Sequence, residues 1–231
     1  MTVFASEPRI VNGGCMGADH QLLAAYDALA ETYDAHRGLF DMRAVLEDLF
    51  ARLPACGTLL DLGCGAGEPC ARAFLDRGWR VTGVDFCPAM LALAARYVPE
   101  MERIQADMRA VRLAPRRFDA VTAIYSLFHV PRRDHPALLA RVRDWLRPGG
   151  RFLFTYATRA YTGAKRFDGT IEFMGQALFY SHATPEELRA QAEAVGLRWE
   201  DATPRAIGGE TFLWVTLVRP TEGAAPETAA R

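Results

Sequence analysis

The sequence predicts an α/β fold, in which a mostly parallel sheet carries helices on both faces. The main observation is that short apolar runs alternate with helical stretches through the middle of the chain, which is typical of βαβ units. The length of 231 residues is that of one elaborated domain rather than two full domains. Half of the residues are hydrophobic and 24% are charged, a composition that excludes a disordered or collagen-like chain.

Two helices are expected before the first strand. Apolar side chains recur at helical spacing in residues 20–35, namely Leu22, Leu23, Tyr26, Leu29, Ala30 and Tyr33. A second helix runs from about Met42 to Leu53 and is stopped by Pro54. We expect residues 21–53 to form these two cap helices.

Five strands alternate with three helices after Pro54. The predicted strands are residues 58–63, 80–85, 103–107, 118–126 and 150–158, each a short apolar run. The predicted helices are residues 69–77, 88–97 and 134–147, the last ended by a Pro148-Gly149-Gly150 turn. Because βαβ crossovers are right-handed and the strands parallel, a ligand is expected at the carboxyl ends of the strands.

The alternation fails in residues 159–183, which we expect to be an insertion rich in aromatic side chains. Thr184 and Pro185, followed by two acidic residues, predict a helix that ends near Val195. Two more strands are predicted, at residues 197–203 and 211–218.

The expected organisation is a single domain over residues 21–219. Residues 1–20 are polar and contain glycines, so we expect a flexible segment there. Residues 220–231 carry too little apolar surface to order themselves, which predicts a disordered tail.

The formal charge is −1, from 27 basic and 28 acidic residues, whereas nucleic-acid phosphates usually require a markedly basic surface. No stretch approaches the ~18 to 20 apolar residues of a membrane-spanning helix, and the start of the chain lacks a signal layout. We therefore expect a soluble, cytoplasmic protein without a nucleic-acid or membrane partner. The five cysteines form no C-x-x-C pair and no zinc-ligand spacing, so no metal is expected.

The most informative stretch is LLDLGCGAGEP at residues 59–69, where a predicted strand runs into three glycines. A glycine-rich turn alone is ambiguous, because phosphate loops, dinucleotide sites and tight turns all use one. No lysine follows the glycines, which argues against a phosphate loop. The glycine motif of a dinucleotide site would have its third glycine at position 68, where this chain has Glu68. Like charges ~4 Å apart cost on the order of 4 kcal/mol, which disfavours a pyrophosphate there.

Three strand ends near the glycines carry aspartates. Asp61 lies in the first predicted strand, Asp85 ends the second and Asp107 ends the third. A carboxylate at Asp85 can accept hydrogen bonds from both hydroxyls of a ribose. A carboxylate at Asp107 can accept one from an adenine amine, with the Met108 backbone amide serving a ring nitrogen. The pattern favours a nucleoside ligand without phosphates.

These residues resemble the successive motifs of the class I S-adenosylmethionine-dependent methyltransferases. The resemblance rests on residues 59–69, Val84-Asp85, Ala106-Asp107-Met108 and residues 118–130, and it covers roughly residues 22–218. It implies a Rossmann-like seven-stranded sheet in the order 3-2-1-4-5-7-6, with the last strand antiparallel and a lid or insertion after strand 5. It implies S-adenosyl-L-methionine as the cofactor. The cofactor-binding residues it implies are Tyr33, Asp61, Gly63, Gly65, Asp85, Phe86, Met90, Asp107, Met108 and Tyr125.

The acceptor of the methyl group is predicted less closely. Tyr125 and His129 follow the fourth strand and are the candidate catalytic residues, although His129 can equally bond a backbone carbonyl to shape the turn before Pro131. The candidate substrate-binding residues are Phe128, His129, Phe173, Met174 and Phe179, which predict a small, partly apolar or aromatic acceptor. The glycines of the insertion, Gly163, Gly169 and Gly175, allow it to move as a lid.

Two other functions are compatible with the sequence. A nicotinamide-dependent oxidoreductase shares the strand, the glycine loop and the ribose acid, but has no tolerable place for pyrophosphate at Glu68. A non-catalytic protein that keeps an S-adenosylmethionine pocket is the other alternative, because a cofactor site does not prove an acceptor site. Enzymes that methylate the amino groups of DNA bases carry an Asp/Asn-Pro-Pro-aromatic motif after the fourth strand. This chain has Tyr125-Ser126-Leu127-Phe128 at that place, so methylation of DNA bases is disfavoured.

Overall fold

The structure, a computed structural model, describes residues 9–11, 18–36 and 40–221. Its centre is a seven-stranded sheet in the order β4-β3-β2-β5-β6-β10-β9. The strands are β2 (Thr58–Leu62), β3 (Arg80–Asp85), β4 (Glu102–Gln105), β5 (Phe118–Ala123), β6 (Leu146–Tyr156), β9 (Arg198–Ile207) and β10 (Glu210–Val218). The strands β2 to β6 pair in parallel, whereas β10 is antiparallel to both β6 and β9. Numbered along the chain, this is the predicted order 3-2-1-4-5-7-6, which is therefore confirmed.

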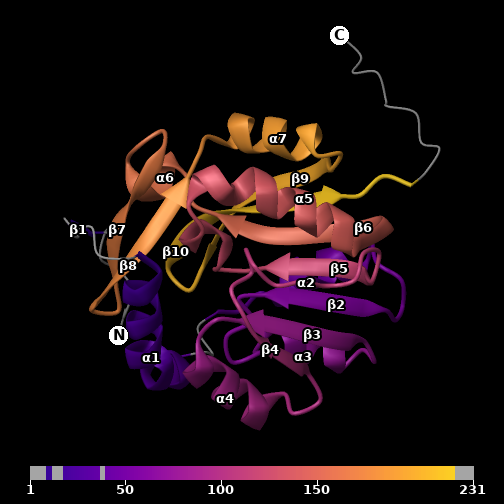
Figure 1. The fold of residues 1–231 in the computed structure, drawn as a ribbon, viewed down its shortest axis with the longest axis horizontal. Helices are drawn as coiled ribbons and strands as arrows, with labels where there is room; N and C mark the ends of the chain where they lie inside the picture. Colours follow the sequence, from indigo (N-terminus) through magenta and orange to yellow (C-terminus); the bar gives the residue numbers. More distant parts are fainter. Residues whose placement is uncertain (1–8, 12–17, 37–39, 222–231) are drawn as a thin grey trace.

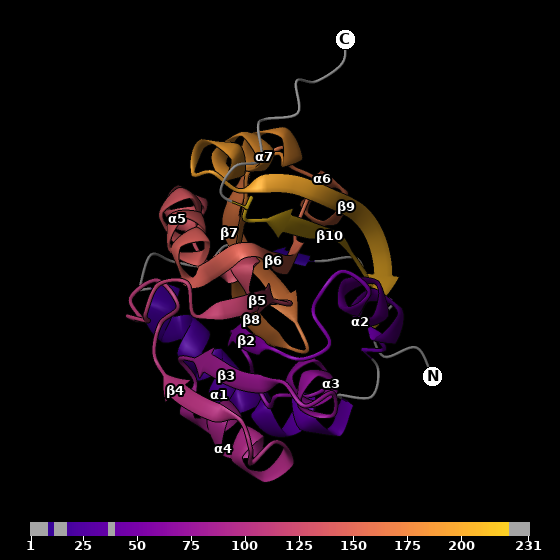
Figure 2. The same ribbon diagram turned by 90° about the vertical axis from the view of Figure 1, so that its right-hand side faces the viewer.

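Helices cover both faces of this sheet. On one face, α5 (His135–Trp145) and α7 (Pro185–Ala194) share an apolar core with the strands. On the other face, α2 (Arg43–Phe50) and α3 (Cys70–Leu75) do the same, together with Ala94 of α4 (Pro88–Tyr97). Figure 2 shows α5 on one side of the sheet and α2 and α3 on the other.

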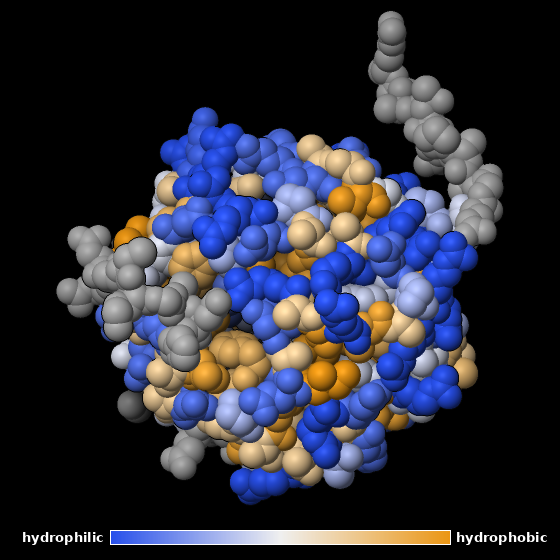
Figure 3. All heavy atoms as spheres, in the orientation of Figure 1, coloured by the Kyte–Doolittle hydropathy of each residue, from blue (hydrophilic) through white to orange (hydrophobic). Residues whose placement is uncertain are grey.

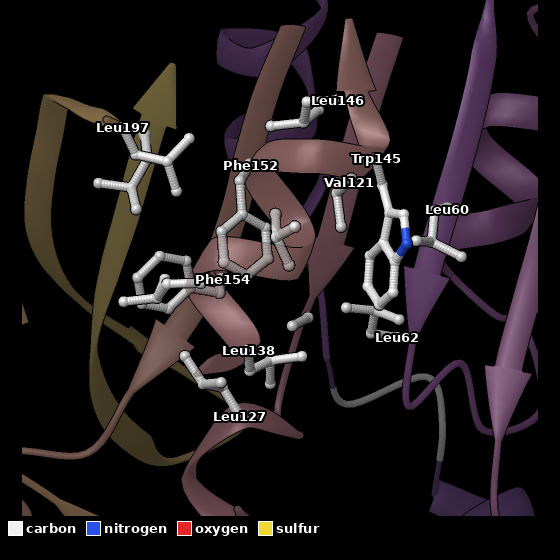
Figure 4. Packing of buried hydrophobic residues seen from close by; sticks show 14 of the residues in the cluster. Leu60, Leu62, Val121, Leu127, Leu138, Trp145, Leu146, Phe152, Phe154 and Leu197 are labelled. Carbon is white, nitrogen blue, oxygen red and sulfur yellow. The ribbon is translucent and has the colours of Figure 1, made fainter. Parts of the chain in front are cut away.

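Burial on both faces explains why the central strands are continuous apolar runs rather than alternating ones. All five residues of β2 are buried. Figure 4 shows the core between the sheet and α5, where Leu60, Val121 and Phe152 of the strands lie beside Leu138 and Trp145. This packing fixes the strands and leaves their carboxyl ends free to carry polar residues.

The predicted insertion forms a β-hairpin that lies beyond the carboxyl ends of the parallel strands of the main sheet. After the short helix α6 (Arg159–Thr162), β7 (Phe167–Phe173) and β8 (Gln176–His182) pair antiparallel, and β1 (Arg9–Val11) adds a third strand to β7. The long helix α1 (Ala18–His36) lies against β8 and α4. The parallel strands point towards α1 and this hairpin (Figure 1).

Two short helical turns connect β5 to α5. The first, η2 (Leu127–His129), follows the end of β5, and the second, η3 (Arg132–Asp134), leads into α5. The α7 helix starts as predicted. The Thr184 side chain accepts a hydrogen bond from the Glu187 backbone amide, and the Glu187 carboxylate accepts one from the Thr184 backbone amide.

The predicted turn at Pro148-Gly149-Gly150 is a bulge within a strand instead. The α5 helix ends at Trp145, and β6 begins at Leu146, opposite Phe118 of β5. The register then shifts, so that Arg151 faces Ala120, and the intervening residues bond to Arg219 after β10. The glycines therefore permit the extra residues of a bulge rather than ending the helix.

The segments predicted to lack order lie mostly outside the described residues. Within residues 1–20, the structure describes only β1 and the first residues of α1; within residues 220–231, it describes the first two. The flexibility of these segments stays a prediction. The capping role predicted for residues 21–53 corresponds to α1 and α2, of which α1 contacts the hairpin.

The surface of the described chain is mixed in polarity. Among the described residues, Ile10 is the single large hydrophobic side chain classed as exposed, at 55%. Figure 3 shows hydrophilic side chains surrounding scattered hydrophobic ones on the face seen in Figure 1. No helix among the described residues has the length and apolarity to cross a membrane.

Candidate active site

A cavity of about 340 Å³ opens where the parallel strands end. Its size is within the range of small-molecule sites. One part, here called the glycine-loop end, is lined by Gly63, Gly65, Asp85, Met90, Asp107 and Met108. The other part, here called the aromatic end, is lined by Tyr26, Phe40, Phe128, His129, Phe173, Tyr180 and Glu210. The sheet thus brings segments from across the sequence to one place.

The glycines of the loop after β2 serve two different purposes. Gly63 has a positive φ of 70°, and a Cβ there would lie 2.4 Å from the Ser126 Cβ atom, so the backbone has no room for a side chain. Gly65 has a φ of 51°, and nothing lies within 4 Å of where its Cβ would be. Gly63 thus lets the loop pack against the segment after β5, whereas Gly65 leaves the cavity open beside the loop.

Asp85, at the end of β3, holds the loop in place. Its carboxylate accepts hydrogen bonds from the backbone amides of Gly65, at 2.8 Å, and Cys87, at 2.9 Å. The residue is only 7% exposed, and burial raises the pKa of its carboxyl, partly offset by these amides. Asp85 lines the cavity, so the same carboxylate both orders the glycine loop and faces the cavity.

Asp61 lies under the loop and is not among the residues that line the cavity. It is 3% exposed and accepts a hydrogen bond from the Thr122 hydroxyl at 2.7 Å. Burial raises the pKa of its carboxyl to about 6, and the nearby Asp85 charge adds to the effect. A structural role in supporting the loop fits this position, and the predicted cofactor contact stays a prediction.

Asp107 reaches the cavity but is already paired. It accepts hydrogen bonds from the Arg109 backbone amide at 2.7 Å and from the Arg109 guanidinium at 2.5 Å. Burial acts to raise the pKa of Asp107, but the hydrogen bonds from Arg109 outweigh it and hold the pKa below its usual value. The carboxylate is therefore ionised, with Met108 beside it in the cavity wall.

Stacked aromatic rings form the wall of the aromatic end. The Phe128 ring stacks on Tyr180, with ring centroids 4.7 Å apart, and on Phe212, with centroids 4.9 Å apart. Tyr26 packs edge-on against Phe86 at 6.2 Å. Offset or edge-on packing of rings is favourable and fixes their positions, so this wall is a preformed apolar surface.

Tyr125 has a left-handed backbone, with a φ of 55°. Its ring packs against Phe40, Phe212 and Trp214, with centroids 5.3 to 5.8 Å apart. Tyr125 is among the lining residues, but its hydroxyl oxygen is buried from solvent. This geometry favours a role in shaping the cavity over proton transfer by the hydroxyl.

His129 connects the cavity to α1 and to the hairpin. Its Nδ1 lies 2.6 Å from the Phe179 carbonyl oxygen, and its Nε2 lies 2.7 Å from the Tyr26 hydroxyl. A carbonyl only accepts hydrogen bonds, so Nδ1 carries the proton and Nε2 accepts from Tyr26. Burial lowers the pKa of His129 to about 4, which leaves the imidazole neutral near pH 7.

Four residues of the aromatic end were not identified from the sequence as site residues: Tyr26, Phe40, Tyr180 and Glu210. Glu210 begins β10 and accepts a hydrogen bond from the Tyr161 hydroxyl at 2.5 Å. A signal for Glu210 was present, because Gly208-Gly209 precedes it between two predicted strands. Such a turn marks an antiparallel hairpin and brings the first residue of the last strand to the edge where the parallel strands end.

Besides Asp61, two predicted residues with described side chains, Met174 and Phe179, are not among those that line the cavity. Met174 lies in the turn of the hairpin, with a φ of 50°, and Phe179 contributes its carbonyl to His129. The Phe179 side chain leaves the cavity because β8 alternates, so that its neighbours Leu178 and Tyr180 point into the apolar cluster beside α1. Tyr33 lies in α1, but its side chain is outside the described residues. Glu68 is also absent from the lining.

The fold and this site together define a class of protein. A sheet in the order 3-2-1-4-5-7-6, with a glycine loop held by the acid after the second strand, is the arrangement of the class I methyltransferases. Residues 59–150 match the model of a family described as a methyltransferase domain. The chain is therefore similar to the class I S-adenosylmethionine-dependent methyltransferases, and residues 59–150 are the part that matches the family model.

Individual relatives agree with this assignment. The trans-aconitate 2-methyltransferase of Azoarcus sp. (strain BH72) is 40% identical over 109 residues, covering 45% of this chain and 41% of that protein. The ubiquinone biosynthesis O-methyltransferase of Pseudomonas entomophila (strain L48) is 29% identical over 202 residues, covering 79% of this chain and 85% of that protein. Three curated relatives are matched over 41%, 60% and 51% of their length, so the chain spans about half the length of these relatives.

A solved structure shows the same fold. The 1,6-didemethyltoxoflavin-N1-methyltransferase of Burkholderia thailandensis superposes with a TM-score of 0.65 at 22% identity, covering 93% of this chain and all of that one. That structure contains S-adenosylhomocysteine and 1,6-didemethyltoxoflavin.

Proposed function

We propose that the protein transfers the methyl group of S-adenosyl-L-methionine to a small, partly apolar or aromatic molecule. The observation that carries the proposal is that a single cavity joins the glycine-loop end to an end walled by aromatic rings. S-adenosylmethionine supplies a methyl group that is already activated as part of a sulfonium. The protein therefore needs to align an acceptor with that methyl group and needs no covalent intermediate.

The glycine-loop end is proposed to hold the cofactor. Asp85 accepts hydrogen bonds from the ribose hydroxyls, and Asp107 with the Met108 amide meets the adenine. Phe86 and Met90 also line the cavity and contribute apolar surface. The open space where a Gly65 side chain would stand supports this assignment, since a larger residue there would narrow the cavity.

The aromatic end is proposed to hold the acceptor. Phe128 and Phe173 provide flat apolar surface, and the hairpin that carries Phe173 covers the cavity together with α1. Exclusion of water by such a cover favours transfer to the acceptor over side reactions. The names of the relatives mention trans-aconitate in one case and ubiquinone biosynthesis in another, so they do not select an acceptor for this chain.

His129 is the proposed base for an acceptor that loses a proton. Its Nε2 carries the basic lone pair of the ring, since Nδ1 is protonated and donates to the Phe179 carbonyl. The Tyr26 hydroxyl occupies that lone pair in the structure, so it has to leave Nε2 before His129 accepts a proton from a substrate. The cytoplasmic location and the small-molecule partner likewise stay proposals.

Two measurements test the function. Calorimetric titration with S-adenosylhomocysteine is expected to show binding, and titration with NADH is expected to show none; the reverse result would identify a nicotinamide enzyme. Incubation with methyl-labelled S-adenosylmethionine and the small-molecule fraction of a cell extract is expected to label an extractable compound. Binding without label transfer would identify a non-catalytic module.

A further inference from the structure

Among the described residues, one carboxylate lines the aromatic end of the cavity, that of Glu210. The residue reaches this place because β10 is antiparallel to β6, so its first residue lies at the edge where the parallel strands end. Glu210 is half-buried and lines the cavity together with Tyr180 and Phe128. A carboxylate in such surroundings loses hydration, and burial raises its pKa.

One oxygen of Glu210 is already used. Its Oε1 accepts a hydrogen bond from the Tyr161 hydroxyl at 2.5 Å. The Tyr161 ring stacks on Tyr180, with ring centroids 5.7 Å apart, and packs on Phe212 at 4.5 Å, so the donor is held rigidly. Among the described residues, no donor bonds to Oε2. An ionised carboxylate accepts several hydrogen bonds, so Glu210 can accept a further one from a ligand in the cavity.

The charges around the cavity favour a ligand that donates a hydrogen bond at the aromatic end over a ligand that carries a negative charge there. Among the described residues, Arg109 is the one lysine or arginine in the lining. Its guanidinium is bound to Asp107, at 2.5 Å, and lies 3.6 Å from Asp134, at the glycine-loop end. A carboxylate placed in the aromatic end would therefore meet the like charge of Glu210, and no lysine or arginine of the described lining lies at that end to balance it.

We propose that Glu210 selects the methyl acceptor. It accepts a hydrogen bond at Oε2 from an O–H or N–H group on an aromatic acceptor that stacks on the Phe128 and Tyr180 wall, and it excludes molecules that carry a carboxylate there. This proposal rests on the proposed function, because the proposed function assigns the aromatic end to the acceptor. It assigns a specificity role to a residue and leaves the accepting atom open.

The test compares two probes of the same ring shape, 2-naphthol and 2-naphthoate, by calorimetric titration. Both are added to the protein with and without bound S-adenosylhomocysteine. The unsubstituted chain is expected to bind 2-naphthol at least tenfold more tightly than 2-naphthoate. In Glu210→Gln the ratio is expected to fall below threefold, because the amide removes the charge and offers an N–H donor to the carboxylate. Glu193→Gln, the same change at an exposed position of α7, is expected to keep the full ratio.

The outcomes separate the two proposals. Failure of S-adenosylhomocysteine to bind overturns the proposed function, and the titrations without it still measure the preference at Glu210. If the cofactor product binds, the selection proposal is overturned by a ratio below threefold in the unsubstituted chain, by absence of 2-naphthol binding, or by an unchanged ratio in Glu210→Gln. If Glu210→Gln does not fold, the ratio of 2-naphthol to 2-naphthoate affinity in the unsubstituted chain alone decides whether the selection proposal stands.

Discussion

The two ends of the cavity are built in different ways. The glycine-loop end comes from the ends of three adjacent strands, β2, β3 and β4, and backbone amides hold its central acid, Asp85. The aromatic end takes side chains from α1, η2, β7, β8 and β10, which are far apart in the sequence and are held by ring packing. The first end is fixed by the main sheet, whereas the second depends on how peripheral elements pack on it.

Under the proposed function, this difference separates the residues that bind a shared cofactor from those that recognise a particular acceptor. The residues around Gly65 and Asp85 are constrained by backbone geometry, so few substitutions preserve them. The aromatic wall tolerates exchange of one ring for another of similar volume, which changes the shape of the cavity while the sheet stays intact. Substitutions at the two ends should therefore affect different measured constants.

The largest effect is expected from His129→Gln at the aromatic end. Loss of a general base typically lowers a rate by ~10²- to 10⁴-fold, so kcat should fall at least about 100-fold once an acceptor is known. The affinity for S-adenosylhomocysteine should not change, because His129 is not part of the glycine-loop end. Tyr26→Phe is the matched control, since it removes the hydroxyl that occupies Nε2 but keeps the ring. A loss below about threefold in His129→Gln would exclude the base role.

The next effect is expected from Asp85→Ala at the glycine-loop end. The change removes the acceptor of the Gly65 and Cys87 amides and the proposed partner of the ribose. Cofactor binding should weaken by about 1.5 to 3 kcal/mol, roughly 10- to 150-fold, as measured by calorimetry. Asp76→Ala, an exposed residue after α3, should bind normally. An unchanged affinity in Asp85→Ala would contradict the assignment of this end.

A smaller effect is expected within the hairpin. Phe173→Ala removes a ring from the cavity wall and should raise the KM for the acceptor by roughly five- to tenfold, the effect of about 1 to 1.4 kcal/mol of lost apolar contact. Phe179→Ala changes a ring that is not among the lining residues and should leave this KM unchanged. Equal KM values for the two variants would show that the hairpin does not contact the acceptor.

The smallest net effect is that of pH on stability, because the contributions of the two ends have opposite signs and largely cancel. The pKa of His129 is about 4 in the folded protein against 6.5 ordinarily, so the unfolded chain binds the proton more readily and acid destabilises the fold. The pKa of Asp61 is about 6 against 3.8, so the folded state binds the proton more readily and acid stabilises it. Between pH 6.5 and 5 we expect a loss of about 1 to 2 kcal/mol from His129 and a gain of about 1 kcal/mol from Asp61.

Denaturant unfolding across this pH range measures both contributions. His129→Gln should lose less stability on acidification than the unsubstituted chain, and Asp61→Asn should lose more. Parallel pH curves for all three proteins would show that neither group titrates differently on folding.

The sequence predicts the glycine-loop end better than the aromatic end for a physical reason. A strand followed by glycines and the acids at the next strand ends are local patterns, and parallel pairing brings them together without further information. The sequence of the hairpin β7–β8 shows no clear alternation of apolar and polar residues, although its side chains alternate in space, because many residues on both of its faces are only partly buried. In α1, both Tyr26 and Tyr33 have helical spacing, and spacing does not tell which of them faces His129. The bulge at Gly149 shows the same limit, since a glycine turn and a glycine bulge look alike in sequence.

The antiparallel direction of β10 affects the order in which the parts of the site are synthesised on the ribosome. The first residue of β10 is number 210 of 231, whereas the loop and acids of the glycine-loop end are complete by residue 109. Chains emerge from the amino terminus and tend to fold in that order. A half-synthesised chain therefore already contains the residues proposed to bind the methyl donor, whereas Glu210, which is proposed to select the acceptor, is added only near the end of synthesis.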